Sequence, residues 1–179
     1  MDVSWIDRDL MASRMSIGDI LSVCGEVCGK EDRKEAMYAL IFDADSRVGG
    51  NAAWVISHLK DDELTFLLPH RRDMMRVVMG ESTITIRRLV LSLLERVGVS
   101  DMCEDSADFL DYCFAHINDV DTPVGVRSLC VKVVLQYCEV YPELCVELAE
   151  QLRLLPFDEL SAGDRHIRKK ILAKITTNI

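Results

Sequence analysis

The stretch that decides the fold reads Ile86-Arg-Arg-Leu-Val-Leu-Ser-Leu-Leu-Glu-Arg-Val97. Its first, fifth, eighth and ninth positions are all apolar and hold Ile86, Val90, Leu93 and Leu94. That spacing follows the 3.6-residue turn of an α-helix with a single buried stripe. We therefore expect one amphipathic helix here, packed along its stripe against neighbouring elements.

The same pattern recurs three more times without gaps. The matching segments are Val48-Gly-Gly-Asn-Ala-Ala-Trp-Val-Ile-Ser-His-Leu59, Val126-Arg-Ser-Leu-Cys-Val-Lys-Val-Val-Leu-Gln-Tyr137 and Ile167-Arg-Lys-Lys-Ile-Leu-Ala-Lys-Ile175. The first positions fall at 48, 86, 126 and 167, so the period is 38, 40 and 41 residues. A self-similar period of this length is typical of helical repeat proteins.

A second, less regular helix is expected between successive copies. The intervening segments run from Glu63 to Met79, from Cys103 to Ile117 and from Pro142 to Leu154. In the first of them, Pro69 predicts a short turn and then a helix that begins at the proline. Each period is thus a helix, a turn and a second helix.

The first 44 residues lack the repeat but still predict helices. Ser16 is a suitable N-cap for one helix, and another is expected from Glu31 to Phe42. Such a pair would cap the front of a stack, whose open end would otherwise expose an apolar face. We expect a single domain over residues 1–179, with capping helices at 1–44 and about three and a half repeats at 45–179.

The repeats resemble HEAT repeats, the α-solenoid units related to armadillo repeats. The family pattern is of the type Val-Arg-x-x-Ala-Ala-x-Ala-Leu-Gly-x-Leu, which this chain matches through Val48, Ala52, Ala53, Val55, Ile56 and Leu59. The stretch Asp121-Thr-Pro-Val-Gly-Val126-Arg127 also resembles the family's approach to that helix. Gly49 in place of Arg, and a fourth copy without a second helix, depart from the pattern. The resemblance implies an all-α fold, a short right-handed α-α superhelix of stacked helix pairs.

Charge and composition restrict the partners. The net charge is -9, but residues 161–179 hold five basic residues and one acid, so that end carries +4 and the rest carries -13. An acidic body repels a phosphate backbone, so nucleic acid is not an expected partner unless one face is locally basic. No stretch is long and apolar enough to span a membrane, and the first nine residues hold three acids rather than a signal sequence. A cytoplasmic location with reduced thiols is expected.

No catalytic, cofactor-binding or metal-binding residue is predicted, and no cofactor is expected. Cys24 and Cys28 would share a helix face, but the chain lacks the Cys-x-x-Cys pairs from which closed zinc sites are usually built. Packing is the simpler use of the cysteines, which are Cys24, Cys28, Cys103, Cys113, Cys130, Cys138 and Cys145. The four histidines are scattered, and no nucleophile turn or phosphate loop is present.

Three features could nevertheless contribute to binding. His70, Arg71, Arg72 and Arg76 form a basic patch, although a solvated helix face explains them as well. Trp54 could anchor a partner or pack in the core. The basic residues Arg165, Arg168, Lys169, Lys170 and Lys174 could form a basic face or the wet side of a last helix. On the resemblance, second helices would line a concave ligand-binding surface, and the recurrent Arg87, Arg127 and Arg168 would join neighbouring repeats.

The function predicted first is a non-catalytic binding or scaffold module that recognises a protein or peptide through the solenoid surface. One alternative, also implied by the resemblance, is a HEAT-like DNA glycosylase for alkylated bases, which would line its surface with cations and aromatics. Another is a structural subunit that associates with itself. Its dimer seam would be the apolar side of the last helix, formed by Ile167, Ile171, Leu172 and Ile175, unless these residues pack back on the third repeat.

Overall fold

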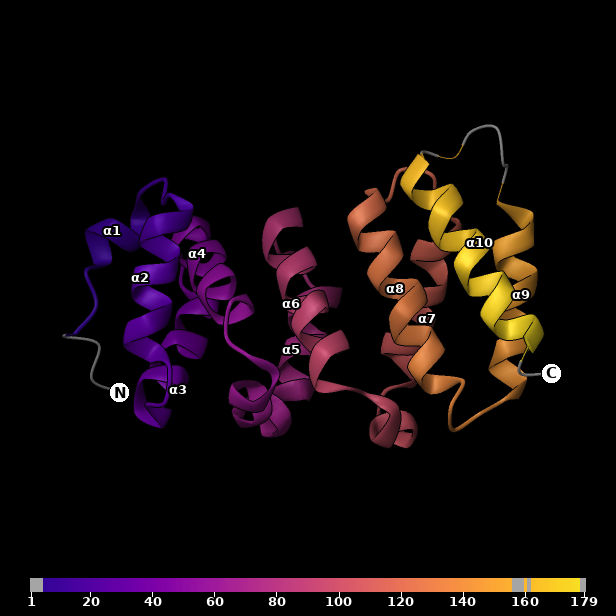
Figure 1. Ribbon diagram of the computed structural model, residues 1–179, viewed down its shortest axis with the longest axis horizontal. Coiled ribbons are helices and arrows are strands. Elements are labelled where there is room, and N and C mark those ends of the chain that lie inside the picture. Colours follow the sequence, from indigo (N-terminus) through magenta and orange to yellow (C-terminus); the bar gives the residue numbers. More distant parts are fainter. Residues whose placement is uncertain (1–4, 156–159, 161, 178–179) are drawn as a thin grey trace. The chain divides into compact units, whose positions relative to one another are not determined.

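The computed structural model describes residues 5–155, 160 and 162–177, and within these residues it contains helices and no strand. This confirms the all-α prediction. The chain divides into two compact units, Met1–Val97 and Gly98–Ile179 (Figure 1). The predicted single domain stays a prediction, so each unit is described by itself.

The first unit is built around the helix that carries the first copy of the repeat. Its elements are α1 (Arg8–Ala12), α2 (Ile17–Val27), α3 (Glu31–Ala39), the 3-10 turn η1 (Leu40–Phe42), α4 (Ser46–Ser57), the 3-10 segment η2 (Asp61–His70), α5 (Arg71–Met79) and α6 (Ile84–Val97). Helix α4 packs against α1, α2, α3 and α6, and α6 packs against α5. The predicted stripe forms the core, because Val48, Ala52 and Val55 are completely buried.

Local sequence signals set the helix boundaries in this unit. Ser16 caps α2 in a capping box with Asp19, as the N-cap prediction required. Asp45 caps α4 by accepting a hydrogen bond from the backbone N–H of Arg47 at 2.8 Å. The prediction at Pro69 was two residues early, since the proline lies inside the 3-10 segment and α5 begins at Arg71. A boundary that falls in a run of 3-10 turns is not defined by proline alone.

Gly49 departs from the family pattern because no side chain fits there. A Cβ atom at this position would lie 2.8 Å from the backbone carbonyl oxygen of Ile41 and 3.2 Å from Cδ1 of Ile86. The next glycine is different, because a Cβ atom on Gly50 would meet Thr85 Cγ2 at an ordinary 3.8 Å. The close approach between α4 and η1 therefore excludes the arginine that the other copies have at this position.

The second unit contains the third and fourth copies. Its elements are the 3-10 segment η3 (Ser100–Asp105), α7 (Ala107–Asn118), α8 (Val124–Tyr137), α9 (Glu143–Leu154) and α10 (Ala162–Thr177). Helix α8 packs against α7 and α9, and α10 packs against α8 and α9. Ile171 and Ile175 of α10 are 6% and 4% exposed, so they pack back within the unit. Ile167 and Leu172, the other two residues of the expected seam, are only half-buried, so self-association through this helix stays a prediction.

Candidate functional site

The predicted basic patch is interleaved with acids and carbonyl groups. Nε2 of His70 lies 2.9 Å from a carboxylate oxygen of Glu35, and its ring stacks on Tyr38. Arg76 forms an ion pair with Asp73 at 2.7 Å. Arg71 donates from Nε to the carbonyl oxygen of Leu68, and Arg72 is not free of partners either. These contacts offset much of the positive charge that the sequence suggested.

A pocket beside this patch has mixed charge. It measures about 490 Å³ and lies between η1, the end of α5 and the start of α6. Asp43, Asp73 and Glu81 line it together with the cation Arg76. With three carboxylates and one guanidinium, this pocket does not favour an anionic ligand.

A second pocket, of about 590 Å³, lies between α4 and α6, two helices that pack side by side (Figure 1). We call it the α4–α6 pocket. Its α4 side consists of Asp45, Ser46, Arg47, Gly50, Asn51 and Trp54, and its α6 side consists of Thr83, Thr85, Arg88 and Leu89. The α4 residues recur at helical spacing, so they share one face of the helix. The volume is within the range of ligand pockets.

Trp54 forms an aromatic wall of the α4–α6 pocket. Its side chain is half-buried, and its ring meets the ring of His58 edge-on at 6.1 Å between centroids. The Trp54 side chain is thus neither fully buried in the core nor fully exposed at the surface. Buried Leu89 lies beside it in the lining. This arrangement offers an apolar surface to any group that enters the pocket.

The charge in the α4–α6 pocket comes from two arginines. Arg47 and Arg88 are exposed, and among the residues that the structure describes neither guanidinium has a hydrogen-bond or ion-pair partner. The carboxylate in the lining, Asp45, is occupied by the N-cap hydrogen bond from the backbone of Arg47. Sequence reasoning singled out Trp54 but neither arginine as a binding residue, since pairing between distant side chains leaves no signal in a single sequence.

The floor of the α4–α6 pocket is held in place by hydrogen bonds. The side-chain amide of Asn51 donates to the carbonyl oxygens of Met11 at 2.8 Å and Ser13 at 3.0 Å, which ties α4 to the end of α1. The Thr83 hydroxyl accepts from the backbone N–H of Ile86 at 3.3 Å at the start of α6. The lining is therefore largely formed before any ligand arrives.

The recurrent arginines have a structural task, as expected. Arg87 donates to the carbonyl oxygens of Gly80 and Ser82 at 3.1 and 3.4 Å, just before its own helix. Arg168 does the same with Arg153 and Leu155 at 3.2 and 2.8 Å. Arg168 thus satisfies carbonyl groups at the end of α9, whereas Arg87 satisfies that of Gly80, directly after α5, and that of Ser82 in the following turn.

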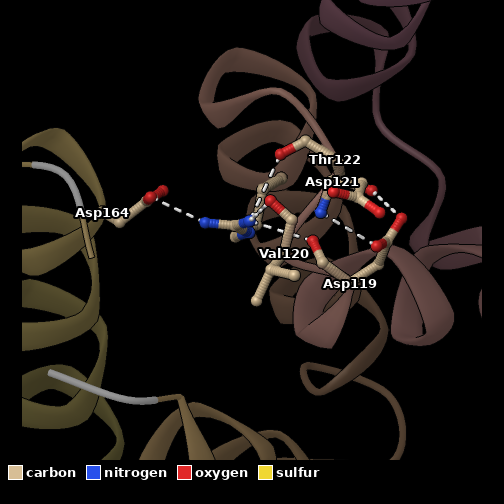
Figure 2. Close-up of polar contacts among 6 residues, drawn as sticks. Asp119, Val120, Asp121, Thr122 and Asp164 are labelled. Carbon is tan, nitrogen blue, oxygen red and sulfur yellow. Dashed lines mark hydrogen bonds and ion pairs between the residues drawn. The ribbon is translucent and has the colours of Figure 1, made fainter. Parts of the chain in front are cut away.

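Arg127 adds an ion pair to this arrangement (Figure 2). Nη2 donates to three carbonyl oxygens in the turn before α8, those of Asp119, Val120 and Thr122, at 2.9, 3.4 and 3.2 Å. Nη1 lies 2.6 Å from Oδ2 of Asp164, which belongs to the first turn of α10, the next copy of the repeat. Both side chains of the pair are almost fully buried. The guanidinium therefore joins two consecutive copies.

The basic end of the chain divides between two tasks. Arg168 turns back to α9, whereas Lys169 and Lys170 are exposed. Arg165 is also exposed and has contacts within its unit. The side chain of Lys174 lies outside the described residues. The exposed lysines belong to the wet side of α10, although a basic face there stays a prediction.

Four of the described cysteines, Cys24, Cys113, Cys130 and Cys138, are buried. Cys113 and Cys130 are completely buried. Burial is the main cause that raises the pKa of the Cys113 thiol well above its ordinary value, and the neighbouring Cys130 is the second cause. Cys24 and Cys28 lie at the end of α2, with Cys28 exposed. The side chain of Cys103 is outside the described residues. Within the described part of the chain, no three His, Cys, Asp or Glu side chains gather as metal ligands would.

The comparison with known proteins identifies one family. The family model for the HEAT repeat domain matches residues 7–175 of the 179, which includes both units. No curated protein and no solved structure matches the chain. In the part of the chain that is described, no helix is both long and apolar enough to cross a lipid bilayer.

Proposed function

Because the chain belongs to the HEAT repeat domain family, we propose that it is a non-catalytic interaction module that binds a protein or peptide partner at the α4–α6 pocket. The family match supports an interaction or scaffold role, and the choice of surface rests on the pocket. A fold does not define a ligand, so the lining residues carry the argument.

The main support for this proposal is that Trp54, Arg47 and Arg88 line one pocket. The Trp54 ring is half-buried, and both guanidinium groups lack partners among the described residues. Tryptophan and arginine are the residues most enriched among binding hot spots. An arginine that pairs with nothing inside its own protein keeps all its donors for a ligand. The second property does not apply to Arg76 of the predicted basic patch, because Arg76 is already paired with Asp73.

Charge favours a protein partner over nucleic acid. The chain carries a net charge of -9, and the neighbouring pocket is lined by three carboxylates, so an extended polyanion would meet repulsion beyond the α4–α6 pocket. A protein segment needs only to enter the pocket. The alternative is a glycosylase for alkylated bases, which would be favoured if the protein captured nucleic acid instead of a protein.

The experiment is capture of partners by the immobilised full-length protein, with bound protein and nucleic acid both identified. Arg47→Glu/Arg88→Glu is compared with Arg72→Glu/Arg76→Glu, which makes the same change in charge on α5. We expect a near-stoichiometric protein that the first double variant loses and the second retains. Capture that survives the first variant would remove the α4–α6 pocket from consideration. Recovery of nucleic acid without protein would favour the alternative.

A further inference from the structure

We propose that the occupant of the α4–α6 pocket is an acidic peptide segment, in which carboxylates bind Arg47 and Arg88 and a neighbouring apolar side chain packs against Trp54. This inference rests on the proposed function and names the chemistry of its partner. It follows from the charges, the aromatic wall and the preformed floor of the pocket.

The charge argument begins with the other arginines of the first unit. Arg8 forms a bidentate ion pair with Asp43, at 2.6 and 2.9 Å, and Arg96 pairs with Asp61 at 2.6 Å. Arg14 is exposed and also contacts no acid among the described residues, but it lines neither pocket. Arg47 and Arg88 stand apart, because they line a pocket and contact no acid among the described residues. A planar guanidinium matches a carboxylate through two parallel hydrogen bonds, so carboxylates are suitable ligands.

The helix starts add to the positive potential. The α4 lining includes Ser46 and Arg47 of its first turn, and the α6 lining includes Thr85, also in a first turn. Helix N-termini carry partial positive charge, which favours an anion nearby. This contribution reinforces the two arginines and does not make a site without them.

The aromatic wall specifies the apolar part of the ligand. Trp54 is half-buried, and Leu89 beside it is 5% exposed. An apolar side chain that covers the exposed part of the Trp54 ring would remove that surface from water. Because Asn51 already anchors this part of α4 to the carbonyl groups of Met11 and Ser13, little ordering is needed on binding.

The size of the pocket and the charge of the chain limit the length of the ligand. A volume of about 590 Å³ holds a few side chains rather than a folded domain. Asp45 in the lining and a net charge of -9 oppose a long polyanion. A short segment with two or three carboxylates around an apolar residue satisfies all these conditions.

The test uses Trp54 as its own reporter. The chain has two tryptophans, so Trp5→Phe in the full-length protein leaves Trp54 as the fluorophore. The probes are blocked eight-residue peptides made from Glu, Leu and Ser, matched by peptides with Lys for every Glu and by peptides with Ser for every Leu. We expect saturable fluorescence changes with the acidic apolar set, and weaker binding of both matched sets.

Charge reversal then locates the contact. In the Trp5→Phe background, Arg47→Glu/Arg88→Glu should weaken binding of the best peptide at least about tenfold. The reason is that two attractions between arginine and carboxylate are replaced by repulsion between carboxylates. Arg72→Glu/Arg76→Glu should change it by less than about twofold. Circular dichroism verifies that each variant is folded.

Three results would overturn the inference. They are no saturable binding of any acidic apolar peptide, equal binding of the Lys peptides, and tighter binding of a single-stranded deoxyoligonucleotide than of the best peptide. If a captured protein still depends on Arg47 and Arg88 while the peptides fail, the proposed function stands and the acidic-segment inference is wrong.

Discussion

The arginine at the second position of the repeat shows how a single residue can join consecutive helices. In three copies it donates to carbonyl groups at the end of the preceding helix or in the turn after it, and Arg127 also binds Asp164. Lysine could not do this, because the task needs several donors in one plane. The residue therefore contributes to the turn between helices as much as to the helix that contains it.

Replacing Arg127 by Ala should strongly destabilise the protein. The change removes the ion-pair partner Arg127 from the buried Asp164 and one donor from each of three carbonyl groups, of which that of Asp119 keeps a hydrogen bond from the backbone N–H of Thr122. We expect a loss of about 3–5 kcal/mol in the free energy of unfolding, measured by denaturant titration. The control is Arg153→Ala, which removes an exposed ion pair with Glu150 and should cost less than about 1 kcal/mol. Equal losses in the two variants would contradict the structural role of Arg127.

The two neighbouring glycines of α4 predict opposite effects of one substitution. Gly49→Ala forces a Cβ atom to 2.8 Å from a backbone oxygen and should lower the free energy of unfolding by about 1–3 kcal/mol. Gly50→Ala meets only ordinary contacts, so its better helix propensity should leave stability unchanged or raise it by up to about 1 kcal/mol. Thermal unfolding of both variants measures the difference. The same sign for both would mean that α4 and η1 do not approach as closely as described.

Single residues were predictable from sequence where the repeat itself carried the signal. Recurrence at one position of the repeat singled out Arg87, Arg127 and Arg168, and the resemblance to HEAT repeats implied their structural role. Arg47 lies just before the first copy and Arg88 is the third residue of the second, so no shared repeat position marks them as a pair. Gly49 was recognised as a departure, but its cause is a carbonyl oxygen of η1 that no local pattern reveals.

At the scale of elements, the periodic apolar stripes located the repeat helices well, because burial of one face decides where a helix lies. The connecting segments were less predictable. Residues 61–70 and 100–105 form 3-10 segments, which lack a distinctive period in sequence. The helix expected from Glu31 to Phe42 likewise ends at Ala39 and continues as a 3-10 turn.

Acid should weaken the helix caps and the ion pairs between elements before it unfolds the apolar cores. Hydrogen bonds from Arg8 and from the backbone of Asp45 lower the pKa of Asp43, and hydrogen bonds from Ser16 lower the pKa of Asp19. A carboxyl group whose folded pKa is depressed stabilises the protein above its unfolded pKa, and this stability is lost as the pH falls through the folded value. We therefore expect the denaturant concentration at the unfolding midpoint to decrease when the pH is lowered below about 4.

The variant Asp43→Asn isolates one of these contributions. It should lower the denaturation midpoint at neutral pH, where Arg8 loses its ionised partner, and make the acid dependence shallower. Asp62→Asn, on the 3-10 segment η2, serves as the control for the loss of one negative charge. An acid dependence as steep in Asp43→Asn as in the unmodified protein would exclude Asp43 as a contributor.

At the scale of the whole molecule, a repeat protein gains its stability from contacts between near neighbours. The main packing contacts of α4 and α6 among the described residues lie in the first unit: α4 packs on α1, α2, α3 and α6, and α6 packs on α5 and η2. Every lining residue of the pocket also falls before Val97. The lining of the proposed binding surface therefore falls within one unit.

It follows that a fragment of residues 1–97 should fold and retain the α4–α6 pocket. The fragment contains the completely buried Val48, Val55, Val90 and Leu94, so the core around the two pocket helices stays intact. We expect a helical circular dichroism spectrum, cooperative unfolding, and the same Trp54 fluorescence response to acidic apolar peptides as in the full chain, within about threefold in affinity. A fragment that is unfolded would show that the first unit needs the second for stability. A folded fragment that fails to bind a peptide recognised by the full chain would place part of the binding surface beyond Val97.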